Sequence, residues 1–357
     1  MTKILLQIIF LTVFCISGYS QKSEMSNAFK NKEFEKVIKL GKELVESEPK
    51  DFDGLLGIGK AYNILNEFNN AIPYLEKAIN YSEKDWQFAW SNIELMESNF
   101  AIGNIEKAKE FYKKSLEYKG TKNSTKKLKG LALLFGFDKV YENWKTLETD
   151  NITFHFQNGT SIIDKENYIK ERENAFLNIN IFFSSYLPKK IDFFVWKSND
   201  EAVKILNKSL GFTNPKYCIS HNRDNQTKGH EIAHNISFWL DNTNNSNRLI
   251  NEGIGVYFDQ TNSDRIQNAK NTLQSKKIDI KEIWLNPNQY SEEILYPIAG
   301  AFIENLVLID KLKFLELCKN QTYENAELIY GKELGKIILD FNNKLNKCRV
   351  GKGESHP

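Results

Sequence analysis

Cysteine and proline are scarce in this chain, which has four cysteines and seven prolines among 357 residues. One cysteine lies in the first apolar run, so a chain cleaved after that run keeps Cys218, Cys318 and Cys348. Three thiols cannot all pair, and their spacing matches no zinc ribbon. The sequence therefore argues against a disulfide-rich scaffold. A bridge between Cys318 and Cys348 stays open, with nothing in the sequence to support it.

An excess of charge of either sign is also missing. The chain has 48 basic and 46 acidic residues and a formal net charge of +2. This balance, with no basic stripe carrying interleaved aromatic residues, gives no reason to expect nucleic acid as a partner. Hydrophobic residues make up 41% and charged residues 26%, which is ordinary for a globular protein. At this length, one large domain or two smaller ones are expected.

Long hydrophobic runs are represented by a single segment, residues 4–16, which follows a lysine. The small residues Gly18 and Ser20 stand at the −3 and −1 positions of a cut before Gln21. This pattern predicts a signal peptide over residues 1–20 and an exported protein, periplasmic or secreted. The alternative is an uncleaved anchor, but the run is shorter than the roughly 20 residues that a bilayer span requires. No membrane span is expected after signal cleavage.

Residues 22–120 consist of helical patterns with few β-branched runs. Small and aromatic residues recur within them at regular offsets, and Val37 and Ala71 are 34 positions apart, as in a helical repeat. Ala108 follows Ala71 by 37 positions, which indicates a small insertion at 82–88. The segment resembles the tetratricopeptide repeat through Gly59, Tyr62, Ala71, Leu75 and Ala78.

The expected first domain is therefore an all-α, tetratricopeptide-like helical array over residues 22–120. A generic array of antiparallel helices is the alternative. In either case each helix pair leaves an apolar face for its neighbour to bury. The resemblance implies a surface that binds a peptide or protein partner, and a spacer or scaffold role stays open. Residues 121–149 are interpreted as a capping helix and a linker.

After residue 150 the pattern changes to β-rich segments at 151–156, 190–196 and 216–222, followed by helices. Strands gathered first and helices later predict an α+β domain over residues 150–348. Residues 349–357 are interpreted as a tail.

The segment HEIAH, residues 230–234, places two imidazoles four positions apart on a predicted helix. Residues i and i+4 share one face, so His230 and His234 can bind one ion together. Glu231 lies about 100° around the helix from His230, where it can reach a water bound to that ion. This geometry explains why H-E-x-x-H serves metal-assisted hydrolysis. A chance match in an ordinary buried helix is the alternative.

A carboxylate, Glu252, follows on a second predicted apolar helix, 18 positions after His234. The segment Asn251-Glu252-Gly253 resembles the one that supplies the third ligand in gluzincins, the zinc peptidases of the thermolysin and membrane-alanyl-aminopeptidase type. Hydrolytic zinc takes three protein ligands and leaves one position for water. We expect Gly253 and Gly255 to let this helix pack closely against the helix of residues 230–234.

The helix expected after it, residues 296–320, is predicted to open with Tyr296, because Pro297 suits a first helical position. It resembles a segment of the gluzincin-like "peptidase MA" families. That resemblance implies that Tyr296 donates to the oxyanion. Tyr257 is a weaker rival for this role. His221 lies where the resemblance places a substrate-binding strand, and an exposed loop histidine is the ordinary explanation. Asp259 could accept a hydrogen bond from a ligand histidine, and a solvated helix surface explains it equally well. His155 and His356 carry no signal.

Together the resemblances predict a multidomain protein with a tetratricopeptide-like array and a C-terminal α+β, zincin-like (gluzincin) domain. They imply a zinc metallopeptidase with one Zn²⁺ on His230, His234 and Glu252. Glu231 is expected to be the general base. The Gly-x-Met-x-Asn stretch of related aminopeptidases is missing before His230, which favours an endopeptidase acting on a peptide or protein. The alternative is a catalytically silent zinc-domain scaffold or binding protein.

Overall fold

The computed structural model describes residues 21–241, 245–274 and 276–346 of the chain. The predicted signal peptide over 1–20, the tail over 349–357, Cys348 and His356 lie outside the described residues. The chain divides into two compact units, residues 1–143 and residues 144–357. Across the described helices, none combines the length and the apolar character that crossing a membrane requires.

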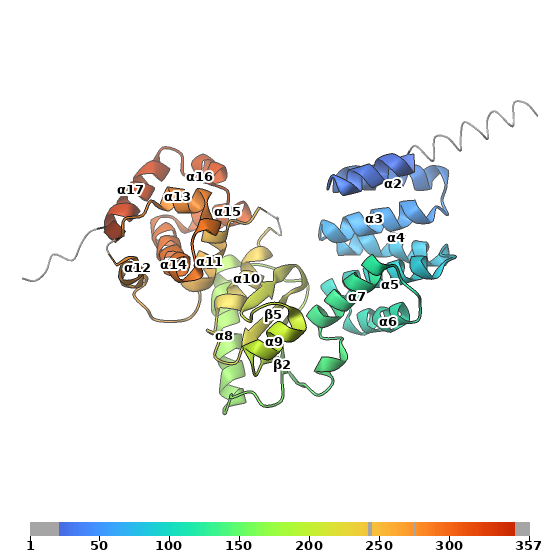
Figure 1. Cartoon of the computed structure of the whole chain (residues 1–357). Coiled ribbons are helices and arrows are strands. Elements are labelled where there is room, and N and C mark those ends of the chain that lie inside the picture. Colours follow the sequence, from blue (N-terminus) through green and yellow to red (C-terminus); the bar gives the residue numbers. More distant parts are fainter. Residues whose placement is uncertain (1–20, 242–244, 275, 347–357) are drawn as a thin grey trace, which may run out of the picture. The chain divides into compact units, whose positions relative to one another are not determined.

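The first unit is helical from residue 21, and its consecutive helices pack against one another and lie one after the next in a stack (Figure 1). This confirms the expected N-terminal helical array. After the opening helical segment at 21–30, its helices are α2 (Phe34–Ser47), α3 (Phe52–Ile64), α4 (Phe68–Asn80), α5 (Asp85–Ala101), α6 (Ile105–Leu116), α7 (Lys122–Phe135) and a short 3-10 helix, η1 (Lys139–Tyr141).

Local residues set the ends of these helices. The Asp51 carboxylate accepts a hydrogen bond from the Gly54 amide at 2.8 Å at the start of α3, and Thr121 caps α7 in the same way. Gly136 ends α7 in the left-handed region at φ 75°. These are the side-chain cap and glycine cap that satisfy backbone groups at helix ends.

Small residues let neighbouring helices of the array approach closely. Ala71, Ala78 and Ala108 are completely buried. A Cβ atom at Gly59 would lie 2.4 Å from the Leu75 side chain, so only glycine fits there beside that leucine without rearrangement. The residues that carried the repeat pattern therefore form the contacts between α3 and α4.

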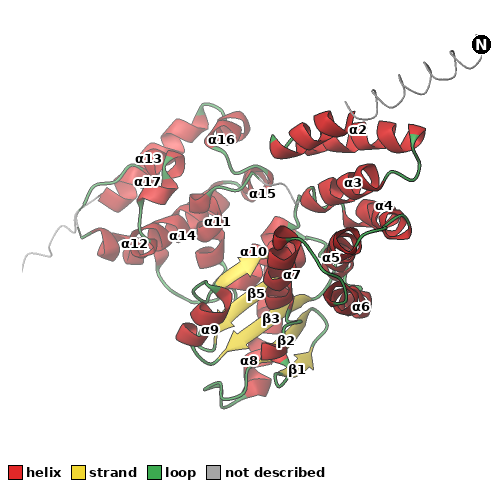
Figure 2. Cartoon of the chain, turned by 45° about the vertical axis from the view of Figure 1, so that its right-hand side comes forward, coloured by secondary structure: helices red, strands yellow, loops and turns green. Residues whose placement is uncertain are grey.

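The second unit contains a five-stranded mixed sheet with the order β1-β2-β3-β5-β4. Figure 2 shows β1, β2, β3 and β5 side by side in this order. The three central strands are parallel, and the two edge strands pair antiparallel with their neighbours. The strands are β1 (Lys145–Glu148), β2 (Ile152–Phe156), β3 (Ile191–Trp196), β4 (Phe212–Asn214) and β5 (Ile219–Arg223). An α+β unit thus follows the array.

Helices make up the rest of this unit, and most follow the sheet in sequence. They are α8 (Lys165–Phe183), α9 (Asn199–Leu206), α10 (His230–Phe238), α11 (Arg248–Tyr257), α12 (Arg265–Leu273), α13 (Ile280–Leu285), α14 (Glu292–Ile309), α15 (Lys311–Lys319), α16 (Tyr323–Tyr330) and α17 (Glu333–Asn346), with 3-10 turns η2 (Pro215–Tyr217) and η3 (Pro287–Gln289).

One hydrophobic core joins the sheet to these helices. Phe154 of β2 pairs in register with Phe193 of β3, and both are buried against Phe176 of α8 and residues of α10, α11 and α14. Strand β3 is buried at five of its six residues, as expected for a parallel strand covered on both faces, whereas β2 alternates buried apolar and partly buried polar residues. The core holds α10 and α11 against each other, which positions the candidate site.

The two edge strands, β1 and β4, were not expected. Three of the four residues of β1 are exposed, and all three residues of β4 are partly exposed, so neither shows an alternation of buried and exposed positions. The strand expected at 216–222 begins only at Ile219, because Pro215–Tyr217 forms a 3-10 turn and Cys218 has a positive φ of 50°. Backbone geometry, rather than composition, sets this boundary.

The helix expected to open with Tyr296 begins earlier, at Glu292, and ends at Ile309, so that expectation was wrong. Glu292 and Glu293 occupy its first turn, where their negative charges interact favourably with the positive end of the helix dipole. Pro297 lies inside the helix. Tyr296 consequently lies one turn after Glu292 on the same helix face.

Candidate metal centre

Helix α10 carries both histidines of the H-E-x-x-H segment. Its residues His230–Ser237 are all buried. Ile232, Ala233 and Ile236 form the face of α10 that packs in the hydrophobic core of the unit. The two imidazoles therefore lie on the remaining face of α10, with ring centroids 4.8 Å apart. Each histidine side chain is about nine-tenths buried.

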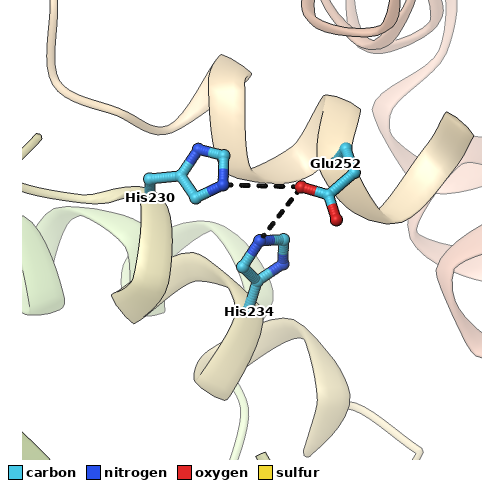
Figure 3. A group of neighbouring side chains, drawn as sticks. All are labelled: His230, His234 and Glu252. Carbon is cyan, nitrogen blue, oxygen red and sulfur yellow. Dashed lines mark ion pairs between the residues drawn. The ribbon is translucent and has the colours of Figure 1, made fainter. Parts of the chain in front are cut away.

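Glu252 of α11 faces this imidazole pair. Its Oε2 lies 3.6 Å from Nε2 of His230 and 3.7 Å from Nε2 of His234, and Figure 3 shows both rings directed at that oxygen. One ligand atom from each residue lies within 4.8 Å of the others. In a tetrahedral site with bonds of about 2.0–2.1 Å, ligand atoms are about 3.3 Å apart. The two distances to Glu252 are close to this value, so these three side chains have the chemistry and the arrangement of a zinc ligand set.

The ionisation of these groups is coupled. Burial by itself raises the pKa of the Glu252 carboxyl, but the two imidazoles outweigh it and hold that pKa well below its usual range. Burial by itself lowers the pKa of His234. The hydrogen bond to Glu252 and the negative charges of Glu252 and Glu231 act in the opposite direction and outweigh burial, so the pKa of His234 is raised overall. His234 Nδ1 is buried without a hydrogen-bond partner among the described residues.

Gly255 makes room for one ligand. A Cβ atom at this position would lie 2.6 Å from the His230 ring. Glycine at this point of α11 thus lets the imidazole lie between α10 and α11, as expected. The expectation for Gly253 was wrong, because a Cβ there would meet Ala299 and Ile303 of α14 and not α10.

Glu231, the expected general base, is 3% exposed and lines the same cavity as the three ligand candidates. Its carboxylate accepts hydrogen bonds from Thr213 Oγ1 at 2.7 Å and from Gln226 Nε2 at 3.3 Å. Sequence reasoning missed Thr213 and Gln226. The first lies in a three-residue strand and the second in a loop, and neither position carries a motif.

Tyr296 also lines this cavity, and its ring lies 5.8 Å from that of His230. Burial, together with Glu252, raises the pKa of its phenol, so Tyr296 keeps its proton at neutral pH. Its rival Tyr257 does not line the cavity among the described residues, and instead contacts Phe258 and Arg265.

Two other candidates lie elsewhere. Asp259 accepts hydrogen bonds from Thr261 and pairs with Arg265, not with a histidine. His221 is completely buried in β5, where its Nδ1 accepts a hydrogen bond from Trp196 and its ring stacks on Phe194. The interpretation of His221 as an exposed loop residue was wrong, since it fills the face of the sheet opposite α8.

The cavity beside the three ligand candidates has a volume of about 440 Å³. Four of its lining residues are carboxylates, and the lining within the described residues contains no lysine or arginine. The carboxylates are Glu231, Asp241, Glu252 and Glu292. An anionic cavity with two imidazoles and a protonated tyrosine can bind a cation and can move a proton from a polarised water.

Comparison with known families concerns the first unit. A family model for the tetratricopeptide repeat matches residues 53–85 and 98–122, which confirms the repeat interpretation for these segments. No curated protein and no solved structure gave a significant match. Tetratricopeptide repeats are typical of scaffolds that bind protein partners, and the array is consistent with that role.

Proposed function

We propose that this protein is a zinc-dependent metallopeptidase of gluzincin type whose helical repeats bind its substrate or a partner. The observation that carries the proposal is the convergence of one ligand atom each from His230, His234 and Glu252 within 4.8 Å. The general base candidate Glu231 lines the same cavity. The fit of two imidazoles and one carboxylate to hydrolytic zinc supports this metal over magnesium or calcium, which favour oxygen ligands.

The residues have distinct roles in this proposal. His230, His234 and Glu252 hold the metal, and Glu231 takes a proton from the attacking water and delivers it to the leaving amine. When bound, zinc lowers the pKa of a coordinated water toward about 7 and polarises the scissile carbonyl. Tyr296, protonated and beside the cavity, donates a hydrogen bond to the oxyanion that develops on that carbonyl.

The charge of the cavity argues against one class of exopeptidase. Asp241 and Glu292 line it in addition to Glu231 and Glu252. A carboxylate at the C-terminus of a substrate would meet like charge here, which disfavours a carboxypeptidase. With the Gly-x-Met-x-Asn stretch missing from the sequence, we propose an endopeptidase that acts on peptides or proteins.

A second function, favoured by the match to the tetratricopeptide repeat, is that of a scaffold with a catalytically silent zinc domain. Silent domains of this kind usually lack the general base or one ligand, whereas Glu231 and all three ligand candidates are present here. An activity assay of the zinc-loaded protein distinguishes the two functions. Only a peptidase hydrolyses a peptide and loses this activity when Glu231 is replaced.

We also propose that the protein is exported. The apolar run at residues 4–16 and the small residues before Gln21 support this step. Expression of the full chain in a bacterium, followed by intact-mass measurement of the exported fraction, should give a mature protein that begins at Gln21. A mass that includes residues 1–20 would contradict the cleavage.

Metal content tests the centre without knowledge of the substrate. We expect the purified protein to bind one equivalent of zinc, measured by inductively coupled plasma mass spectrometry, and the variants His230→Ala and Glu252→Ala to lose it. Glu292→Ala is the matched control, because this residue lines the same cavity but is not a proposed ligand. A control that also loses zinc, or a Glu252→Ala variant that keeps it, would contradict the ligand set.

A further inference from the structure

The carboxylate of Glu231 is held by two side chains from outside its own helix. Thr213 of β4 donates to Oε2 at 2.7 Å, and Gln226 of the loop before α10 donates to Oε1 at 3.3 Å. The Thr213 hydroxyl also lies 3.2 Å from the Glu231 carbonyl oxygen. Each carboxylate oxygen therefore has one side-chain donor and keeps a lone pair for a proton.

Thr213 lies on β4, an edge strand of the sheet. Thr213 pairs in register with Ser220 of β5, and the residues around it on β4 contact α10. A threonine has few χ1 rotamers because of its branched Cβ, so a strand residue of this type presents its hydroxyl in a defined direction. The edge strand thereby fixes a donor against α10.

Side chains of α8 fix the backbone of the loop that carries Gln226. Arg172, itself 3% exposed, donates from Nη2 to the Gln226 carbonyl at 2.8 Å. Lys228, two residues further along, pairs with Glu171 of the same helix at 2.7 Å. Gly211 has a positive φ of 84°, and a Cβ there would lie 3.0 Å from the Gln226 amide, so this glycine leaves room for it.

We propose that Thr213 and Gln226 are positioning residues that hold Glu231 in the orientation needed for proton transfer. This inference rests on the proposed function, because it concerns the general base of that reaction. A glutamate carboxylate rotates freely about its last torsion, and two donors on opposite oxygens fix its plane. A general base that is already held in the reactive orientation does not have to lose rotational freedom in the transition state, so kcat is higher than for a freely rotating carboxylate.

The test uses zinc-loaded full-length protein and four variants. Thr213→Val removes the hydroxyl at nearly constant shape, Thr213→Ser keeps the hydroxyl, and Gln226→Met removes the amide. Thr153→Val, on a strand outside the cavity, is the matched control. We expect kcat for an internally quenched peptide to fall about 10- to 100-fold in Thr213→Val and Gln226→Met, with KM and zinc content unchanged. Thr213→Ser should recover most of kcat.

Crystal structures of the wild type and Thr213→Val, both grown under the same conditions with zinc added, give a readout that depends neither on turnover nor on whether zinc binds. We expect the Glu231 carboxylate to adopt one orientation in the wild type and more than one in the variant. Unchanged kcat in Thr213→Val, an equal loss in Thr213→Ser, or one unchanged Glu231 orientation would overturn the inference.

Failure of the proposed function has a different signature. In that case the wild type binds no zinc or Glu231→Gln retains full hydrolysis, whatever Thr213 does. The orientation of Glu231 in the two structures still decides the positioning role. In an active enzyme, adding Thr213→Val to Glu231→Gln should cause no further loss, since Thr213 acts through Glu231.

Discussion

Each unit of the molecule contains two buried or largely buried carboxylates, Glu94 and Glu97 in the first unit and Glu231 and Glu252 in the second, and the two clusters are completed in different ways. In the helical array, Glu94 and Glu97 of α5 share one cation, Lys127 of α7, at 2.7 Å each. Asn63 of α3 also donates to Glu94 at 3.1 Å. Burial lowers the pKa of Lys127, but the two carboxylates outweigh it and raise that pKa overall.

In the α+β unit, Glu252 faces two imidazoles, beside a cavity lined by three further carboxylates. No lysine or arginine from the described residues lines that cavity. Removing carboxylates from water is costly unless a cation or hydrogen-bond donors compensate. The array meets this cost with its own lysine, whereas the cavity is arranged so that a metal ion can do so. The first cluster thus belongs to the fold and the second to a candidate function.

The largest expected effect separates the two clusters by activity. Glu231→Gln should lower hydrolysis of a labelled, unfolded protein substrate by about 10²- to 10⁴-fold, because the amide cannot accept the proton of the attacking water. Zinc content should stay the same. Glu97→Gln, a matched change at a buried carboxylate of the array, should leave hydrolysis unchanged. Undiminished hydrolysis by zinc-loaded Glu231→Gln would favour the scaffold function.

Two glycine substitutions sharpen the contrast. Gly255→Ala forces a Cβ to 2.6 Å from the His230 ring, so zinc affinity, measured by competition with a chelator, should weaken by about 10- to 100-fold. Gly59→Ala crowds Leu75 in the array and should lower the free energy of unfolding by about 1–3 kcal/mol. It should not change zinc affinity. Equal zinc affinity in wild type and Gly255→Ala would show that His230 can move without cost.

Removal of the metal should affect one unit only. At a zinc concentration about 100 times Kd, binding stabilises the folded state by about 2.7 kcal/mol, and a chelator reverses this. In hydrogen-exchange mass spectrometry, chelation should increase exchange in α10 and α11 and leave α3 and α4 unchanged. A matching increase in all four helices would mean that the metal is not localised at the proposed centre.

The smallest expected effect concerns the cluster of the array. Lys127→Met leaves Glu94 and Glu97 without their cation, and should lower the free energy of unfolding by roughly 2 kcal/mol, a value reduced because Lys127 is 30% exposed. Lys126→Met, an exposed position on the same helix, should change it by less than about 0.5 kcal/mol. Denaturant titration of both variants provides the comparison. Altered zinc content in Lys127→Met would contradict the separation of the two clusters.

Parts of the architecture were predictable because they depend on local geometry. The small residues Gly59, Ala71 and Ala78 recur at offsets that helix pairing requires, and the array follows from them. The strand segments at 152–156 and 191–196 were visible because buried parallel strands are rich in aromatic and branched residues. The edge strands β1 and β4 gave no such signal, since edge strands owe their conformation to one neighbour.

The sequence by itself determined that His230 and His234 share one face, because four residues make about one helical turn wherever the helix lies. It also singled out Glu252, through a resemblance and not through geometry. Only the tertiary structure decided how Glu252 meets both imidazoles, why Gly255 matters to His230, and that Thr213 and Gln226 reach Glu231. These contacts join segments separated by loops and strands, whose relative positions depend on packing of the whole core and leave no local periodicity in the chain.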